Sequence, residues 1–95
     1  MTEPAWESLD QAIAFLHLHW SERVIDRIVS RLWENIELLL EFPFGGQVEA
    51  DLAYLGKGHR RIVVGHFKVI YYVDGDVVFV TDIFDSRQDP GKMKG

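Results

Sequence analysis

Apolar residues in the first 42 positions recur at helical spacing. A first stripe has steps of four, three and four residues and comprises Leu9, Ile13, Leu16 and Trp20. A second, broader stripe comprises Ile25, Ile28, Leu32, Ile36 and Leu39. Thr2 and Ser21 stand where each helix needs an N-cap, and the segment 42–46, with its proline and two glycines, ends the second helix. Because hardly any residues separate the helices, residues 1–42 are predicted to form an antiparallel helical hairpin.

From residue 47 the period changes. Segments 61–65, 67–73 and 77–84 are rich in Val, Ile, Phe and Tyr and are predicted to be strands, with Tyr71 on the core face. The residues around Gly75 and Gly65 predict the two hairpin turns. Residues 47–55 fit either a short strand or an irregular approach to the sheet, and the polar residues 86–95 are expected to form a tail. The order of elements predicts an α+β domain over residues 1–95, with a helical hairpin (1–42) followed by an antiparallel sheet (47–85).

Composition removes several classes of protein and site. With 47% hydrophobic and 26% charged residues in 95, the chain is neither disordered nor fibrous. Cysteine is absent, which excludes disulfides, thiolate metal sites and a cysteine nucleophile. No apolar run approaches the roughly 20 residues of a membrane span. The first twenty residues hold no Lys or Arg, so no secretory n-region is indicated and a cytoplasmic location is expected.

The net charge of −5 is unevenly distributed. Residues 1–56 carry three basic and ten acidic side chains (net −7), whereas residues 57–95 carry seven basic and five acidic ones (net +2). Proteins that neutralise phosphates are usually basic overall. Any contact with nucleic acid is therefore expected to be local to the C-terminal half.

Two arginines and a histidine are the candidate catalytic residues. RNA cleavage through the 2′-hydroxyl needs a base, an acid and a cation over the phosphate. Arg61 and Arg87 can supply the cation, and His66 or His59 the acid–base function. Both arginines serve one site only if the meander brings the start of one strand and the end of another together. The alternative is surface pairing with nearby carboxylates, namely Glu49, Asp82 or Asp85.

A second set of residues is predicted to bind a partner: Arg23, Arg27, Arg31, Trp20 and Arg60. The first three line one face of the second helix, which is either a solvated face balanced by Asp26 and Glu34 or a docking strip for an acidic segment. Trp20 is expected in the core or lining a groove. His17 and His19 diverge on a helix, so no metal site is predicted, and no cofactor is expected.

Several segments together resemble the RelE/ParE superfamily of bacterial type II toxin–antitoxin toxins. They are Ala5, Leu9 and Ile13 in the first helix, Pro43 and Gly45 after the second, and the segments 60–65, 67–73 and 83–90. The resemblance implies a helical hairpin packed on a small twisted antiparallel sheet. It also implies a toxin neutralised by a cognate antitoxin, whose target is DNA gyrase in ParE-like members and mRNA on the ribosome in RelE-like members.

The chain departs from the superfamily pattern in two ways. It opens four residues before Ala5, where members usually have a strand, so an exposed sheet edge is expected to form a homodimer or bind an antitoxin strand. Residues 88–95 contain no Tyr or His of the kind that RelE-like nucleases carry beyond the Arg87-type arginine. A ParE-like toxin acting on a protein target such as gyrase is therefore the leading hypothesis. The alternatives are an mRNA interferase using Arg61, Arg87 and a histidine, and an inert antitoxin-binding relative.

Overall fold

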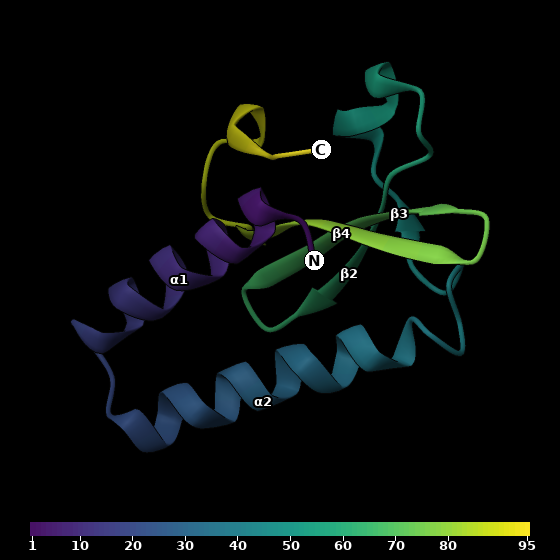
Figure 1. Ribbon diagram of the computed structural model, residues 1–95. Coiled ribbons are helices and arrows are strands. Elements are labelled where there is room, and N and C mark those ends of the chain that lie inside the picture. The colour runs from purple at the N-terminus through teal and green to yellow at the C-terminus, as the bar shows by residue number, and fades with distance from the viewer.

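A computed structural model describes residues 1–95 and places two helices against one sheet (Figure 1). The elements are α1 (Glu3–His17), α2 (Glu22–Leu38), β1 (Gln47–Val48), η1 (Ala50–Leu55), β2 (Arg60–Val64), β3 (Phe67–Asp74), β4 (Val77–Asp85) and η2 (Pro90–Lys92), where η marks a 3₁₀ helix. The ambiguous segment 47–55 contains both a two-residue strand and a 3₁₀ helix. The predicted α+β class is confirmed.

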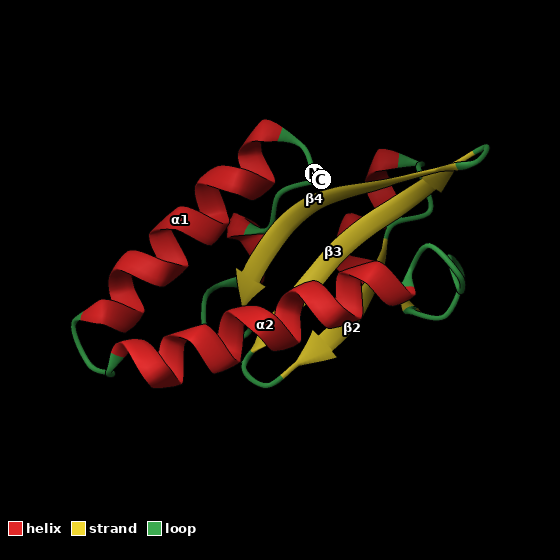
Figure 2. Ribbon diagram, turned by 60° about the horizontal axis from the view of Figure 1, so that its bottom comes forward, coloured by secondary structure: helices red, strands yellow, loops and turns green.

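Both helices begin at the caps that the sequence predicts. The Oγ1 of Thr2 and the Oγ of Ser21 each accept a hydrogen bond from the backbone N–H three residues on, at 3.3 and 3.4 Å. The helices join through residues 18–21 and diverge from that turn (Figure 2). Trp20 is the exception to the predicted stripe. Because α1 ends at His17, Trp20 lies in the connecting turn with 56% of its surface exposed.

The sheet is a meander with strand order β1-β2-β3-β4, antiparallel throughout. Gly65 and Gly75, both at φ +59°, adopt the left-handed conformation that the two hairpin turns require. The β3–β4 register shifts by one residue between Ile70 and Tyr71, which leaves Thr81 without a pairing partner. Since neighbouring strands are antiparallel, β2 and β4 run in the same direction.

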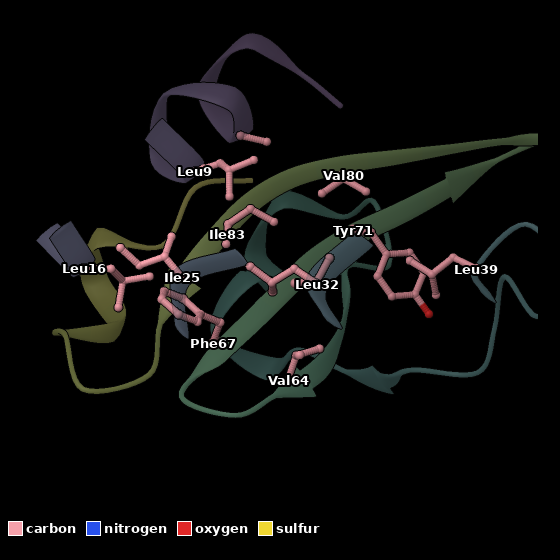
Figure 3. Close-up of a cluster of buried hydrophobic side chains, with 12 residues drawn as sticks. Leu9, Leu16, Ile25, Leu32, Leu39, Val64, Phe67, Tyr71, Val80 and Ile83 are labelled. Carbon is pink, nitrogen blue, oxygen red and sulfur yellow. The ribbon is translucent and has the colours of Figure 1, made fainter. Parts of the chain in front are cut away.

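The main core lies between the helices and one face of the sheet (Figure 3). Its buried residues are Ala5, Leu9, Leu16, Ile25, Leu32, Leu39, Val64, Phe67, Val69, Tyr71, Val80 and Ile83. Both helical stripes contribute to this core, as predicted, and Tyr71 is fully buried in it. Burial of these side chains supplies most of the driving force that holds the hairpin on the sheet.

Residues 86–95 do not extend as a tail but fold back over the other face of the sheet. Met93 is buried in a small second cluster with Leu52, Ile70 and Phe84. The N–H of Lys94 donates to a carboxylate oxygen of the buried Asp82 at 2.9 Å. An apolar side chain and a buried acceptor thus fix a segment that is otherwise polar, because an unpaired buried carboxylate is costly.

β4 is an edge strand, as expected from the lack of a strand before α1. The residue before α1 nevertheless contacts this edge, because the backbone N–H and the hydroxyl of Thr2 both donate to the carbonyl of Val80, at 3.0 and 3.1 Å. No other strand pairs with the outer side of β4. None of the helices combines the length and apolar character that a membrane crossing requires.

Candidate functional site

A groove of about 590 Å³ opens where the α1–α2 turn, the β2–β3 turn and the segment after β4 meet. Seven of its twelve lining residues are hydrophobic, so apolar contact dominates its floor. The lining residues are Phe15, Leu16, His19, Trp20, Val24, Ile28, Arg31, Val64, Gly65, His66, Phe67 and Arg87. Four of the sequence-predicted site residues therefore converge here: Trp20, Arg31, His66 and Arg87.

Local backbone bonds bring the two loops of the groove together. The carbonyl of His66, in the β2–β3 turn, accepts hydrogen bonds from both the backbone N–H and the hydroxyl of Ser86, each at 2.8 Å. Phe67 pairs with Asp85 in the last register position of the sheet. Arg87 follows two residues later, and both Arg87 and His66 line the groove.

Within the groove, Arg87 forms an ion pair with Asp85. The Asp85 carboxylate accepts its guanidinium N–H groups at 3.0 and 2.7 Å and its backbone N–H at 2.9 Å. The side-chain hydrogen bond from Arg87 holds the pKa of Asp85 below its usual range, and it raises the pKa of Arg87 in return. Arg31 has no carboxylate within ion-pair distance. The groove therefore combines a mainly apolar lining with two guanidinium groups, that of Arg87, which Asp85 orients, and that of Arg31, which is unpaired.

Arg61 does not join this site. It lies at the start of β2, whereas Arg87 follows the end of β4, and the two strands run in the same direction. The condition for a shared arginine pair is thus not met, because the two side chains belong to opposite ends of the sheet. The Arg61 guanidinium instead donates to the carbonyl of Val48 at 2.8 Å and to the Gln47 side chain at 3.0 Å.

The buried Glu49, which follows β1, links that part of the chain to β2 and β3 through two ion pairs. The buried carboxylate of Glu49 lies 3.4 Å from Arg61 and 3.5 Å from Lys68. Arg60 donates to the carbonyl of Gly46 at 2.8 Å and packs over the ring of Phe44. These contacts give Arg60 and Arg61 a structural role, since they tie β1 and the preceding loop to β2.

The two candidate histidines have different surroundings. His59 is buried, packs edge-on against Tyr72 and donates through Nε2 to the carbonyl of Gly95 at 3.1 Å. His66 is exposed in the groove, where His19 is the other imidazole. Of the acid–base residues that the sequence suggests, only His66 is accessible near Arg87.

The remaining predicted partner residues, Arg23 and Arg27, lie outside the groove on the exposed face of α2. Asp26 and Glu34, which can offset the arginines by spacing, form no ion pair with them. Sequence reasoning overlooked Phe15 as a groove residue. The position of Phe15 could have indicated this role, because this large aromatic residue lies outside the apolar stripe of α1, and its side chain is 50% exposed.

Comparison with known families gives one match that covers most of the chain. Residues 1–90 match the family of the ParE toxin of the type II toxin–antitoxin system parDE. No curated protein matches the chain. The match includes both helices, the whole sheet and the groove residues. The chain belongs to the ParE toxin family of type II toxin–antitoxin systems.

Proposed function

We propose that this toxin arrests bacterial growth by binding a protein target, DNA gyrase, through the groove, and that a cognate antitoxin neutralises it. The observation that carries the proposal is the composition of the groove, whose lining is mainly apolar, includes Trp20 and Phe15, and also contains Arg31 and Arg87. Aromatic and arginine side chains are the residues that dominate binding energy in protein interfaces. Such a lining suits an apolar segment of a protein that carries acidic residues.

The arrangement of charges argues against the alternative of RNA cleavage. An interferase using Arg61, Arg87 and a histidine needs these groups around one phosphate. Arg61 lies at the far end of the sheet and is bonded to Val48 and Gln47. The net charge of −5 also disfavours approach to a polyanion. Of the three groups in that mechanism, only His66 and Arg87 line the same groove.

We further propose that the open side of β4 receives a strand of the antitoxin. β4 is nine residues long and has no strand on its outer side, where Thr2 occupies the carbonyl of Val80. The remaining unpaired backbone groups of such an edge recruit extended segments of other chains. Pairing of two copies through the same edge is the competing use of β4.

Expression of the chain in the bacterial cytoplasm without an antitoxin tests whether it arrests growth. The wild-type chain is expected to stop growth and produce filamentous cells with a DNA-damage response, while protein synthesis continues. Arg87→Ala is expected to fold and to weaken the arrest, and Lys57→Ala, an exposed cation outside the groove, to behave as wild type. Rapid loss of protein synthesis with cleaved mRNA would establish the interferase instead. Normal growth with soluble wild-type protein would identify an inert antitoxin-binding relative.

A further inference from the structure

The arginines of α2 and most of its glutamates lie in separate bands. Its N-terminal half carries a basic band (Arg23, Arg27 and Arg31) together with two acids, Glu22 and Asp26, whereas its C-terminal end and the turn after it carry an acidic band (Glu34, Glu37 and Glu41). All six side chains are exposed, and none forms an ion pair within the chain. These six groups, on α2 and the turn after it, thus remain without partners, as do Glu22 and Asp26.

Both bands lie on the same face of the helix. At about 100° per residue, the six positions fall within an arc of about 120°, roughly opposite the buried Ile25, Leu32 and Leu39. Glu41 lies three residues past the end of α2, in a turn that continues the helix direction, where the N–H groups of Glu41 and Phe42 both donate to the carbonyl of Leu38, at 3.1 and 2.9 Å. In Figures 1 and 2 no other element covers the side of α2 that faces away from the sheet.

The pattern does not stabilise the helix itself. The helix dipole favours acidic residues near the N-terminus and basic residues near the C-terminus, and the two bands have the reverse order. The basic band also places like charges four residues apart, where they repel. Only Glu22, in the first turn, follows the preference. The order of the bands is therefore better explained by a contact with another molecule.

The bands are complementary to themselves. Arg23 and Glu41 each lie nine residues from Leu32, and Arg27 and Glu37 each lie five residues from it. Arg31 and Glu34 lie one and two residues from the same centre. When two copies of α2 pack antiparallel with their Leu32 residues at the same height, every arginine of one copy therefore lies about level with a glutamate of the other along the helix axis, and Asp26 lies level with Leu38.

We propose that the solvent face of α2 is a homodimer interface, occupied by α2 of a second copy in antiparallel orientation. Two-fold symmetry repeats each of the three pairings, as an isologous interface requires. Leu38, on the same face and 52% exposed, adds an apolar contact. Because exposed ion pairs are individually weak and screened by salt, the dimer dissociates at high ionic strength. Arg31 belongs to both this face and the border of the groove, but the proposal does not depend on the identity of the toxin's target.

Sedimentation equilibrium of the whole chain tests the proposal. At high micromolar concentration we expect dimers in about 0.01 M salt and monomers in about 1 M salt, where the screening length falls from about 30 to about 3 Å. Two charge-reversed variants are compared. The all-acidic variant carries Arg23→Glu, Arg27→Glu and Arg31→Glu, and the all-basic variant carries Glu34→Arg, Glu37→Arg and Glu41→Arg.

Each variant alone is expected to be monomeric at low salt, and an equimolar mixture is expected to form heterodimers. Both reversals add charges that the helix dipole favours, so melting temperatures at or above that of the wild type exclude misfolding. A control with the same charge change elsewhere carries Glu3→Arg, Asp10→Arg and Asp76→Arg, and should not pair with the all-acidic variant. A wild-type monomer at low salt, dimers of either variant alone, or a mixture that stays monomeric would each overturn the proposal. Dimers in both variants would point to the β4 edge.

Discussion

Asp85 accepts three hydrogen bonds from Arg87, two from the guanidinium at 3.0 and 2.7 Å and one from the backbone N–H at 2.9 Å. The two residues are separated by Ser86, whose backbone and hydroxyl are bonded to the carbonyl of His66. The guanidinium therefore has a defined orientation although 57% of the side chain is exposed. A preoriented arginine loses less conformational entropy when a partner binds.

Asp85→Asn should give a small, pH-dependent loss of stability. The Arg87 hydrogen bond depresses the pKa of Asp85 in the folded state, so its contribution is present above the unfolded pKa of about 3.9. It is lost as the pH falls through the folded pKa. Melting temperatures measured from neutral to acidic pH should show a gap between wild type and variant at pH 7 that closes in acid. A gap that is unchanged in acid would mean that the carboxylate charge does not contribute.

Trp20→Ala should abolish growth arrest with little change in stability. The side chain lies in the α1–α2 turn, lines the groove and is largely exposed, and surface substitutions of this kind change stability by about 0.5 kcal/mol or less. Trp6→Ala is the matched control. Trp6 is 46% exposed but packs against Trp33 outside the groove, so its loss should lower the melting temperature and leave growth arrest intact. The reverse result would remove the groove from the function.

Tyr71→Phe should destabilise the fold by about 1–3 kcal/mol. The buried hydroxyl accepts a hydrogen bond from the N–H of Gly46 at 2.9 Å, and phenylalanine leaves that donor unsatisfied. Tyr72→Phe provides the control, because the Tyr72 hydroxyl forms no hydrogen bond within the chain and its ring stacks on Phe79 in either form. Urea denaturation of both variants measures the difference. Equal midpoints would show that the Gly46 contact contributes nothing.

Met93→Ala should cost about 2–5 kcal/mol. Met93 is only 7% exposed and fills the second cluster with Leu52 and Ile70. Lys92→Ala, one residue earlier and exposed, should be close to neutral. Thermal unfolding of the two variants distinguishes a packed C-terminal segment from a loose one. If Met93→Ala melts with the wild type, the segment does not contribute to the folded state.

Local chemistry accounts for the parts of the fold that the sequence predicts correctly. Thr2, Ser21, Gly65 and Gly75 each act within a few residues, as caps or as turn residues, so their roles follow from neighbouring positions alone. The helical pattern wrongly includes Trp20 in the first helix, because Trp20 continues the spacing of the stripe after the helix has ended at His17. Helix ends depend on tertiary contacts, which periodicity does not record.

The site was harder to predict because it depends on long-range geometry. Met93 is buried by Leu52 and Ile70, which are distant in sequence, so nothing near residue 93 indicates its burial. The separation of Arg61 and Arg87 can be predicted from the sequence, because alternate strands of a meander, here β2 and β4, run in the same direction. The groove cannot be predicted in this way, because Phe15 and His66 come to line it only through the packing of α1 against the sheet.

We propose that the groove binds a protein target, and inhibition of purified DNA gyrase by the purified chain is the sharpest test of this binding. Gyrase supercoiling of relaxed plasmid is measured with increasing amounts of the wild-type chain, Trp20→Ala and Trp6→Ala. We expect the wild type and Trp6→Ala to inhibit supercoiling, and Trp20→Ala to do so at least about tenfold less well, as the loss of one interface anchor predicts. Unchanged supercoiling in an excess of wild-type toxin, with cleavage of mRNA on purified ribosomes by the same preparation, would contradict it.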